Sequence, residues 1–364
     1  MQRQGKIVAV FAIALVVLFG ALVLQTGMFG KKRAQGSFLP KEEAALRYPY
    51  QQLTEREQQL YTALYEGVSA CQRTISLPDS YTADEYEKVY LLMTMQEPQF
   101  FYVSKVYQLA DVMRETEIEY LMTGAELTAC QAMLESAAVR LTSSLDDSMS
   151  DAEKLAEIHD AIARNCSYES GDNTSNAYGC LCEGSALCEG YAKAFCYLAR
   201  KAGCDVMCVT GTTDEGEKHV WNIAEIDGAY YNIDVTWDDN AAFRDVVSHR
   251  CFAIPDRRFE GHVPDRQGFI PPNCTEDVAN VYHQNGMILN EATLIGDYCG
   301  RWAEQAVANG YMEFYCLTKE VYRAVTEDME NGGEVAEAIS PYCESSYFRY
   351  IPDDYEQIVM ILFD

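Results

Sequence analysis

The hydrophobic residues that follow residue 41 recur at helical spacing. In one run they lie three or four positions apart, or side by side, as expected for the buried face of a helix: Leu60, Tyr61, Leu64, Tyr65 and Val68. Ser/Thr-x-x-Glu pairs, which can cap the start of a helix, occur four times: Thr54/Glu57, Thr82/Glu85, Thr123/Glu126 and Ser150/Glu153. Residues 34–147 are therefore predicted to form a mostly helical module, with short strands at 100–107 and 118–122.

The pattern changes from about residue 148 to helix, loop, helix and then several strands. A helix is predicted over 189–201, after a loop at 169–187 that is rich in Ser, Gly, Asn and Asp. Three runs rich in β-forming residues follow, at 206–210, 219–226 and 229–237. Asp227-Gly228 separates the last two runs, and this dipeptide is a strong signal for a two-residue hairpin turn.

The rest of the chain predicts a connector and a small C-terminal α/β unit. A helix is expected over 293–309, a strand over 311–316, and a closing hairpin around Pro352-Asp353. The fold class is therefore expected to be α+β. The expected divisions are an N-terminal segment, the helical module, a central domain with its connector, and the C-terminal unit: residues 1–33, 34–147, 148–288 and 289–364.

The N-terminal segment has the pattern of a membrane anchor. Residues 7–24 form an unbroken run of 18 apolar or Gly residues, which as a helix would span roughly 27 Å. Basic residues flank the run on both sides, so their count does not fix its orientation. A cleaved signal peptide is the alternative, but no Ala-x-Ala-like site follows. We expect a retained single-pass anchor within residues 7–29, with the soluble domains outside the cell.

The charge of the chain excludes some partners. The 364 residues include 56 Asp and Glu but only 28 Lys and Arg, which gives a formal net charge of -28. Such a surface repels nucleic-acid phosphates and anionic lipid, so nucleic acid is not an expected partner. The 14 cysteines are too dilute for a disulfide-stapled miniprotein.

The predicted hairpin brings a histidine and a carboxylate together. With Asp227-Gly228 as its loop, Trp221 falls opposite Asp234, and His219 falls opposite Thr236. His219 and Asp234 then project from one sheet face as diagonal neighbours, with Cβ atoms roughly 6–8 Å apart. One hydrogen bond can close that gap, so the register alone predicts a His–Asp pair.

Cys188 is the candidate nucleophile for this pair. It begins the predicted helix, whose positive N-terminal end favours a thiolate. The unpaired N–H groups there, including that of Cys188, point to where an oxyanion would form. Gly190 would let a substrate backbone approach closely. His219 would take the thiol proton, and Asp234 would hold the imidazole and stabilise its cation.

Three segments in order resemble the motifs of the transglutaminase-like superfamily: ALCEGYAKAF at 186–195, KHVWN at 218–222 and YNIDVTWD at 231–238. The resemblance covers roughly residues 150–265. It implies a papain-like core, with Cys188 as nucleophile, His219 as base and Asp234 as orienting acid. It also implies acyl transfer at a protein or peptide amide through a thioester. Gln transamidation, deamidation and peptide-bond hydrolysis all stay open.

The same residues are consistent with two other functions. The principal alternative is a surface scaffold, or binding module, that keeps the fold but has lost catalytic activity. A weaker alternative is a purely structural, disulfide-rich protein. Tyr178 is a candidate second oxyanion donor. Cys180, Cys182 and Cys188 lack zinc-site spacing and a matching His, so no metal is expected, although a disulfide involving Cys180 or Cys182 is possible.

The remaining histidines have no predicted catalytic role. His159, on the face of an amphipathic helix, is expected to be structural, while His249, His262 and His283 are assigned no role. No cofactor is expected. The oligomeric state is left open.

Overall fold

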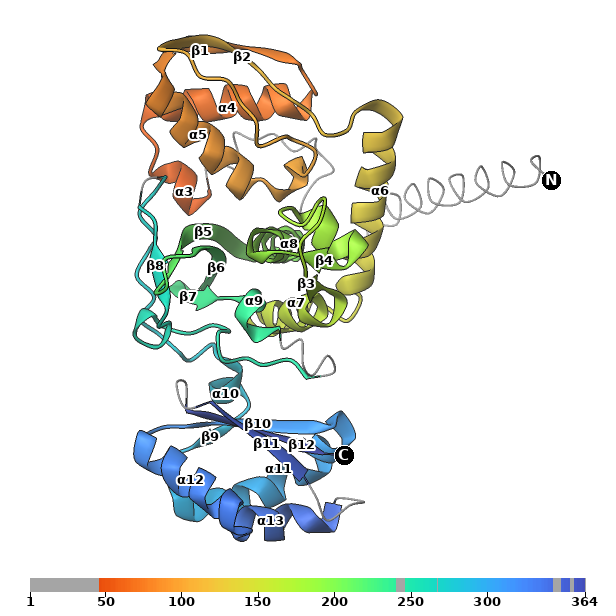
Figure 1. The fold of residues 1–364 in the computed structure, drawn as a ribbon, viewed down its shortest axis with the longest axis vertical. Helices are drawn as coiled ribbons and strands as arrows, with labels where there is room; N and C mark the ends of the chain where they lie inside the picture. Colours follow the sequence, from red (N-terminus) through yellow and green to blue (C-terminus); the bar gives the residue numbers. More distant parts are fainter. Residues whose placement is uncertain (1–45, 240–245, 267, 343–347, 354–356, 364) are drawn as a thin grey trace, which may run out of the picture.

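The computed structural model describes residues 46–239, 246–266, 268–342, 348–353 and 357–363. The predicted membrane anchor lies outside these residues. Within them, no helix has both the length and the apolar composition needed to cross a bilayer. Three units follow one another along the long axis of the molecule, in chain order (Figure 1). Helices and sheets are both present, so the α+β class is confirmed.

The N-terminal unit is mostly helical. Its elements are α3 (Tyr48–Gln51), α4 (Glu55–Ser69), β1 (Thr74–Thr82), α5 (Ala83–Gln96), the 3₁₀ turn η1 (Pro98–Phe100), β2 (Val112–Glu117) and α6 (Gly124–Leu141). The predicted capping boxes form at Thr54 and Thr82, and also at Ser150 at the start of the next helix. Thr123 precedes α6 but its side chain makes no capping hydrogen bond.

The two strands predicted in this unit are confirmed only as a single antiparallel bridge, between Val103 and Tyr120. The 3₁₀ turn η1 takes up the start of the first predicted strand, and the full strands of this unit are β1 and β2, which pair antiparallel. These two strands are largely exposed: Ile75 and Tyr81 are the buried residues of β1, and Met113 and Thr116 those of β2. Such polar strands carry little of the hydrophobic alternation on which the prediction depended.

The central unit packs helices against an antiparallel sheet. The helices are α7 (Asp151–Asn165), α8 (Cys188–Lys201) and the short α9 (Val235–Asp238). The sheet has the order β7-β6-β5-β8, made of β5 (Asp205–Thr213), β6 (Lys218–Ile226), β7 (Ala229–Ile233) and β8 (His262–Pro264). Helix α8 lies against β5, β6 and α7, and its residues from Gly190 to Ala199 are buried. A π-helical segment (Gly179–Glu183) and the paired short strands β3 (Ser167–Tyr168) and β4 (Ser185–Ala186) precede α8.

The hairpin register is confirmed. Asn222 pairs with Ile233 and Ile226 with Ala229, as the two-residue loop requires. Asp227 and Gly228 both have positive φ, at 52° and 82°, as a type I′ turn demands. The second strand is shorter than predicted, because it ends at Ile233. Asp234 leaves the ladder there and caps α9, so the cross-strand pairs predicted for His219 and Trp221 do not form.

The C-terminal unit has a separate core. Its sheet has the order β11-β12-β10-β9, made of β9 (Ile288–Leu289), β10 (Tyr311–Cys316), β11 (Phe348–Asp353) and β12 (Ile358–Phe363). The helices are α11 (Ile295–Asn309), α12 (Lys319–Asn331) and α13 (Glu334–Ile339), with α10 (Val281–Gln284) leading in. The predicted helix, strand and closing hairpin are confirmed. The other two units share one continuous hydrophobic core, from Tyr50 to Ala279.

Candidate active site

Cys188 is the first residue of α8. The residue before it, Leu187, has no side chain that can cap the helix, whereas α4, α5 and α7 all begin with capping boxes. The first N–H groups of α8 therefore have no side-chain acceptor of that kind. Cys188 is half-buried and lines a cavity. A thiol at this position lies at the positive end of a helix, next to free donors.

His219 and Asp234 form the predicted pair. Nε2 of His219, on β6, lies 2.6 Å from Oδ2 of Asp234. The other ring nitrogen, Nδ1, is left for Cys188, whose side chain is hydrogen-bonded to His219. Burial favours the neutral imidazole, but the hydrogen bonds and negative charges of Asp234 and Cys188 outweigh it and raise the pKa of His219 to about 10. The three predicted residues are thus brought together in one hydrogen-bonded chain.

Asp234 is buried but fully paired. Its Oδ1 accepts hydrogen bonds from the backbone N–H groups of Thr236 and Trp237, at 2.9 and 3.4 Å. Its Oδ2 accepts from His219 and from a second histidine, His262, at 3.0 Å. Burial alone would raise the pKa of Asp234, but the two histidines hold it well below its usual value. The carboxylate is therefore ionised wherever the site is folded near neutral pH.

His262 is the residue that sequence reasoning missed. Its Nδ1 lies 3.1 Å from the backbone carbonyl of Glu260, which can only accept, and its Nε2 faces Asp234. Both ring nitrogens therefore face oxygen atoms, which hold the ring in place beside Asp234. Its ring is stacked on Phe259, with centroids 3.6 Å apart, and lies 4.1 Å from that of Trp237.

The pairing of β8 with β5 is what brings His262 to the site. Its place in the register is opposite Thr213, near the end of β5. The strand has only three residues and lies 28 positions beyond Asp234. Nothing in the local pattern around it signals that pairing.

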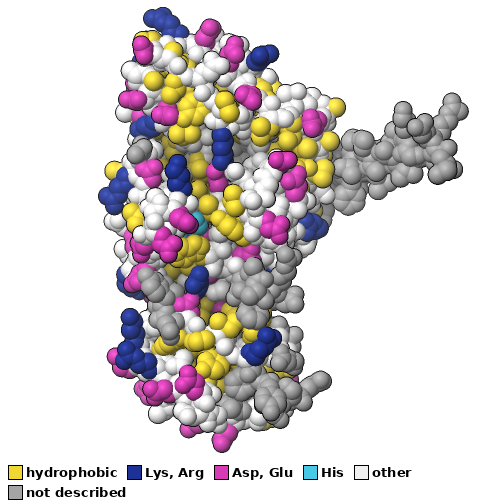
Figure 2. All heavy atoms as spheres, viewed as in Figure 1, with side chains coloured by type: hydrophobic (Ala, Val, Ile, Leu, Met, Phe, Trp, Pro, Cys, Tyr) yellow, Lys and Arg dark blue, Asp and Glu magenta, His cyan; other side chains and the backbone are white. Residues whose placement is uncertain are grey.

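The site opens into a cavity of about 1280 Å³ between the N-terminal and central units. Its walls come from α5, the segment after it, the loop before α8, α8, β5, β6 and β8. Apolar side chains are part of this lining: Leu91, Met95, Phe101, Leu121 and Val263. Figure 2 shows acidic side chains spread over the visible face of the molecule instead of gathered in one patch. The excess of acid is thus distributed over this face.

A carboxylate next to the nucleophile is neutralised by two lysines. Glu189 lies 2.8 Å from Lys193, one turn further along α8, and 2.5 Å from Lys105, on the segment after α5. Burial opposes ionisation of Glu189, but the two ammonium groups lower its pKa. This arrangement also ties the N-terminal unit to the start of α8.

Two further predictions about the site are corrected. A Cβ at Gly190 would lie 2.4 Å from the carbonyl oxygen of Thr174, so this glycine is needed for packing inside the protein and not for substrate approach. The hydroxyl of Tyr178 faces the sulfur of Met133 at 3.5 Å, and Tyr178 does not line the cavity. Asn176, upstream of the nucleophile, does line it.

The cysteines in the described part of the chain, Cys180 and Cys182 among them, are free thiols. The disulfide considered for these two residues is therefore not formed.

Comparison with known proteins supports the family resemblance. Residues 136–235 match a family model described as the transglutaminase-like superfamily. Two solved structures are similar over part of the chain. One, from Cytophaga hutchinsonii and described as a candidate cysteine protease, has 22% identity and a TM-score of 0.27, over 37% of this chain and 42% of that one. The other, described as a TGase, has 13% identity and a TM-score of 0.27, over 36% and 43%.

These matches are partial. The chain spans less than half the length of either solved structure. None of the curated proteins matches it.

Proposed function

We propose, from the membership of residues 136–235 in the transglutaminase-like superfamily, that this chain transfers acyl groups from amides through a thioester on Cys188. One observation carries the proposal: Cys188, His219 and Asp234 form a hydrogen-bonded chain at the uncapped start of α8, on the wall of a large cavity. Thiol, imidazole and carboxylate in this order are the parts that nucleophilic catalysis by cysteine requires.

The chemistry follows from this order. His219 holds the proton that Cys188 gives up, and the thiolate attacks the carbonyl carbon of an amide. Negative charge develops on the carbonyl oxygen, where the N–H of Cys188 at the helix start can donate to it. His219 then protonates the leaving amine, the C–N bond breaks, and a thioester remains. Water or a second amine, deprotonated by His219, attacks the thioester and releases an acid or a new amide.

The cavity favours a peptide or protein substrate. Its volume of about 1280 Å³ exceeds the roughly 300–1,000 Å³ of ordinary small-molecule sites. It is also an open cleft between two units and not an enclosed pocket, which suits an extended chain. The membrane anchor at residues 7–29 and an extracellular position of the site are further parts of the proposal, and they rest on the sequence alone.

Selective alkylation tests whether Cys188 is activated. The full-length chain is treated with iodoacetamide near neutral pH, and the adducts are mapped by mass spectrometry. Cys71, an exposed free thiol, serves as the internal reference. We expect Cys188 to react faster than Cys71, and we expect His219→Ala to remove the difference while His283→Ala keeps it. Equal rates at the two cysteines in the wild type would refute the proposal.

Turnover separates the reactions that stay open. Casein is offered together with a fluorescent primary amine, and both amine incorporation and new peptide ends are measured. Incorporation indicates a transamidase, new ends indicate a peptidase, and release of ammonia alone indicates a deamidase. Cys188→Ser is the control, and it must abolish whichever activity is seen. Activity that survives in Cys188→Ser would contradict the assignment of the nucleophile.

A further inference from the structure

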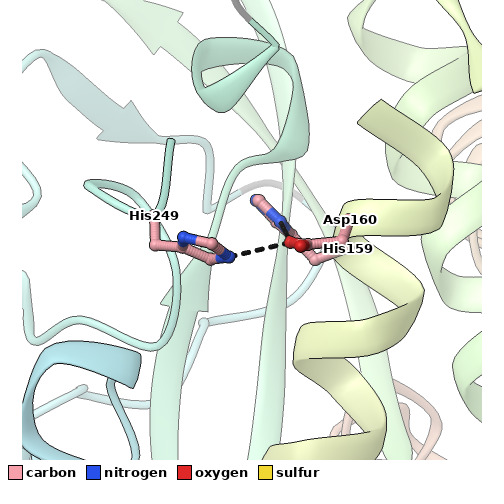
Figure 3. A group of neighbouring side chains, drawn as sticks. All are labelled: His159, Asp160 and His249. Carbon is pink, nitrogen blue, oxygen red and sulfur yellow. Dashed lines mark hydrogen bonds and ion pairs between the residues drawn. The ribbon is translucent and has the colours of Figure 1, made fainter. Parts of the chain in front are cut away.

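A second cluster of titratable side chains lies apart from the Cys188 site. Its centre is His159 and Asp160 on α7 and His249, which follows residues 240–245 (Figure 3). One ligand atom from each of the three lies within 4.8 Å of the other two. The side chain of His159 is fully buried, while those of Asp160 and His249 keep 17% and 10% of their exposure. An ion could therefore reach the cluster from solvent.

The ligand atoms of the two histidines both face one carboxylate oxygen of Asp160. Its Oδ1 lies 3.2 Å from Nδ1 of His159 and 2.8 Å from Nε2 of His249. Its Oδ2 is held by Arg164 at 2.8 Å, which leaves Oδ1 directed between the two rings. Tetrahedral zinc with bonds of about 2.0–2.1 Å places neighbouring ligand atoms about 3.3 Å apart. The separation between Asp160 and His159 is close to this value, and the separation between Asp160 and His249 is about 0.5 Å shorter.

Each histidine is oriented by a second carboxylate. Nε2 of His159 lies 3.1 Å from Oδ2 of Asp238, and Nδ1 of His249 lies 2.5 Å from Oε1 of Glu313. Asp238 and Glu313 are buried. A histidine that binds a metal through one nitrogen nearly always donates its other N–H to a carboxylate or carbonyl, which fixes its orientation. Both histidines have this arrangement.

The outer carboxylates are themselves held in place. Asp238 accepts from the backbone N–H of Cys251 at 3.1 Å to each oxygen, and Glu313 accepts from the hydroxyl of Tyr282 at 2.9 Å. The cluster is therefore supported on both sides by fixed hydrogen bonds.

Either protons or a metal ion can lie between Oδ1 of Asp160 and the two histidine nitrogens that face it. In the first, a proton lies in each gap, and both histidines are cations whose stacked rings have centroids 5.3 Å apart. In the second, one divalent ion replaces both protons, which leaves the total charge unchanged and both imidazoles neutral. The second arrangement avoids two like charges side by side in a buried place. It also gives the outer carboxylates, Asp238 and Glu313, the role they usually have at metal sites.

We propose that His159, Asp160 and His249 bind a zinc ion, with solvent at the fourth position. Two imidazoles and one carboxylate are a ligand set that suits zinc. Glu313 belongs to β10, so the site would link the C-terminal unit to α7 of the central unit through His249. This site is independent of Cys188, and its existence does not depend on the proposed activity.

Metal binding by the full-length chain tests the proposal directly. The protein is stripped with a chelator and titrated with Zn²⁺ and, separately, with Co²⁺, in a Cys188→Ser background that removes the reactive thiol. We expect one tightly bound ion per chain. We also expect a visible cobalt spectrum without the sulfur-to-cobalt charge-transfer band that thiolate ligands give. No stoichiometric binding, or a strong charge-transfer band, would overturn the proposal.

Variants locate the ion. His249→Gln is expected to abolish binding, and Glu313→Gln, which keeps the shape of the outer residue, is expected to weaken it about 10–100-fold. His283→Gln is the matched control, because His283 lies on α10 beside Asp277 and outside the cluster. It should bind as the wild type does.

If His249→Gln fails to fold, the titrations of the Cys188→Ser chain and of Glu313→Gln in that background still decide the test. Affinity that Glu313→Gln leaves unchanged would overturn the assignment. Binding that is lost in His219→Gln but kept in His249→Gln would do so as well, because the ion would then belong to the group of His219, Asp234 and His262.

Discussion

Replacing Asp234 with Asn removes the charge that supports His219 and changes little else. The carbonyl oxygen of the amide can still accept from the N–H groups of Thr236 and Trp237, which Oδ1 of Asp234 now caps. The amide NH₂ then faces His219 and His262 in place of Oδ2. Because NH₂ only donates, His219 must carry its proton on Nδ1, where it can no longer take one from Cys188.

The size of the effect follows from the pKa of His219. Its value of about 10 lies about 3.5 above the ordinary 6.5, which at 1.36 kcal/mol for each pH unit corresponds to at most about 5 kcal/mol. Asp234 contributes more to this increase than Cys188 does, through both its hydrogen bond and its charge. We therefore expect Asp234→Asn to lower the pKa of His219 by at least about 2.

Histidine NMR measures this pKa without knowledge of the substrate. The chain has five histidines, so selective ¹³C labelling gives few signals, and His219→Gln identifies the one required. The wild-type signal should titrate near 10 and that of Asp234→Asn should titrate nearer neutrality. His283→Gln, which is remote from the site, should leave the His219 signal unchanged. A His219 pKa that is the same in Asp234→Asn as in the wild type would refute the reasoning.

Three further predictions concern stability. Gly190→Ala should lower the free energy of unfolding in a urea titration by about 1–3 kcal/mol, because the added Cβ would lie only 2.4 Å from a backbone atom. Gly300→Ala is the control: it has open space around the added Cβ, so it should leave this free energy unchanged or raise it. Ser150→Ala should cost about 1 kcal/mol through loss of its capping box, while Thr123→Ala, which loses no such bond, should not change the melting temperature. The raised pKa of His219 contributes stability that is complete below pH 6.5 and lost as pH rises through about 10. In His219→Gln, the urea concentration at the unfolding midpoint should therefore vary less with pH over that interval. The same pH dependence in the variant as in the wild type would contradict the raised pKa.

Much of the site could be predicted because its signals are local. Asp227-Gly228 fixes the register of the hairpin, and the register sets the distance between His219 and Asp234. Cys188 is marked by its place at a helix start. Even here, the strand was predicted too long, because Asp234 caps a helix where the β-forming pattern continues.

What was missed depends on contacts distant in sequence. His262 reaches Asp234 through a three-residue strand, and Glu313 reaches His249 from a different unit. The sequence pattern predicts a structural role for His159, and its side chain is buried, but its polar partners are its neighbour Asp160 and Asp238 of α9. No periodicity along the chain indicates such pairings, since they are set by how the units pack.

The pH dependence of Cys188 alkylation tests the central claim most directly. In the full-length wild type, the rate of reaction with iodoacetamide is measured at Cys188 and at exposed Cys71 from about pH 5 to pH 9. An imidazole that takes the thiol proton predicts that Cys188 reacts faster than Cys71 over this range, and that His219→Gln removes the difference. Parallel curves for the two cysteines, unchanged in His219→Gln, would contradict the account.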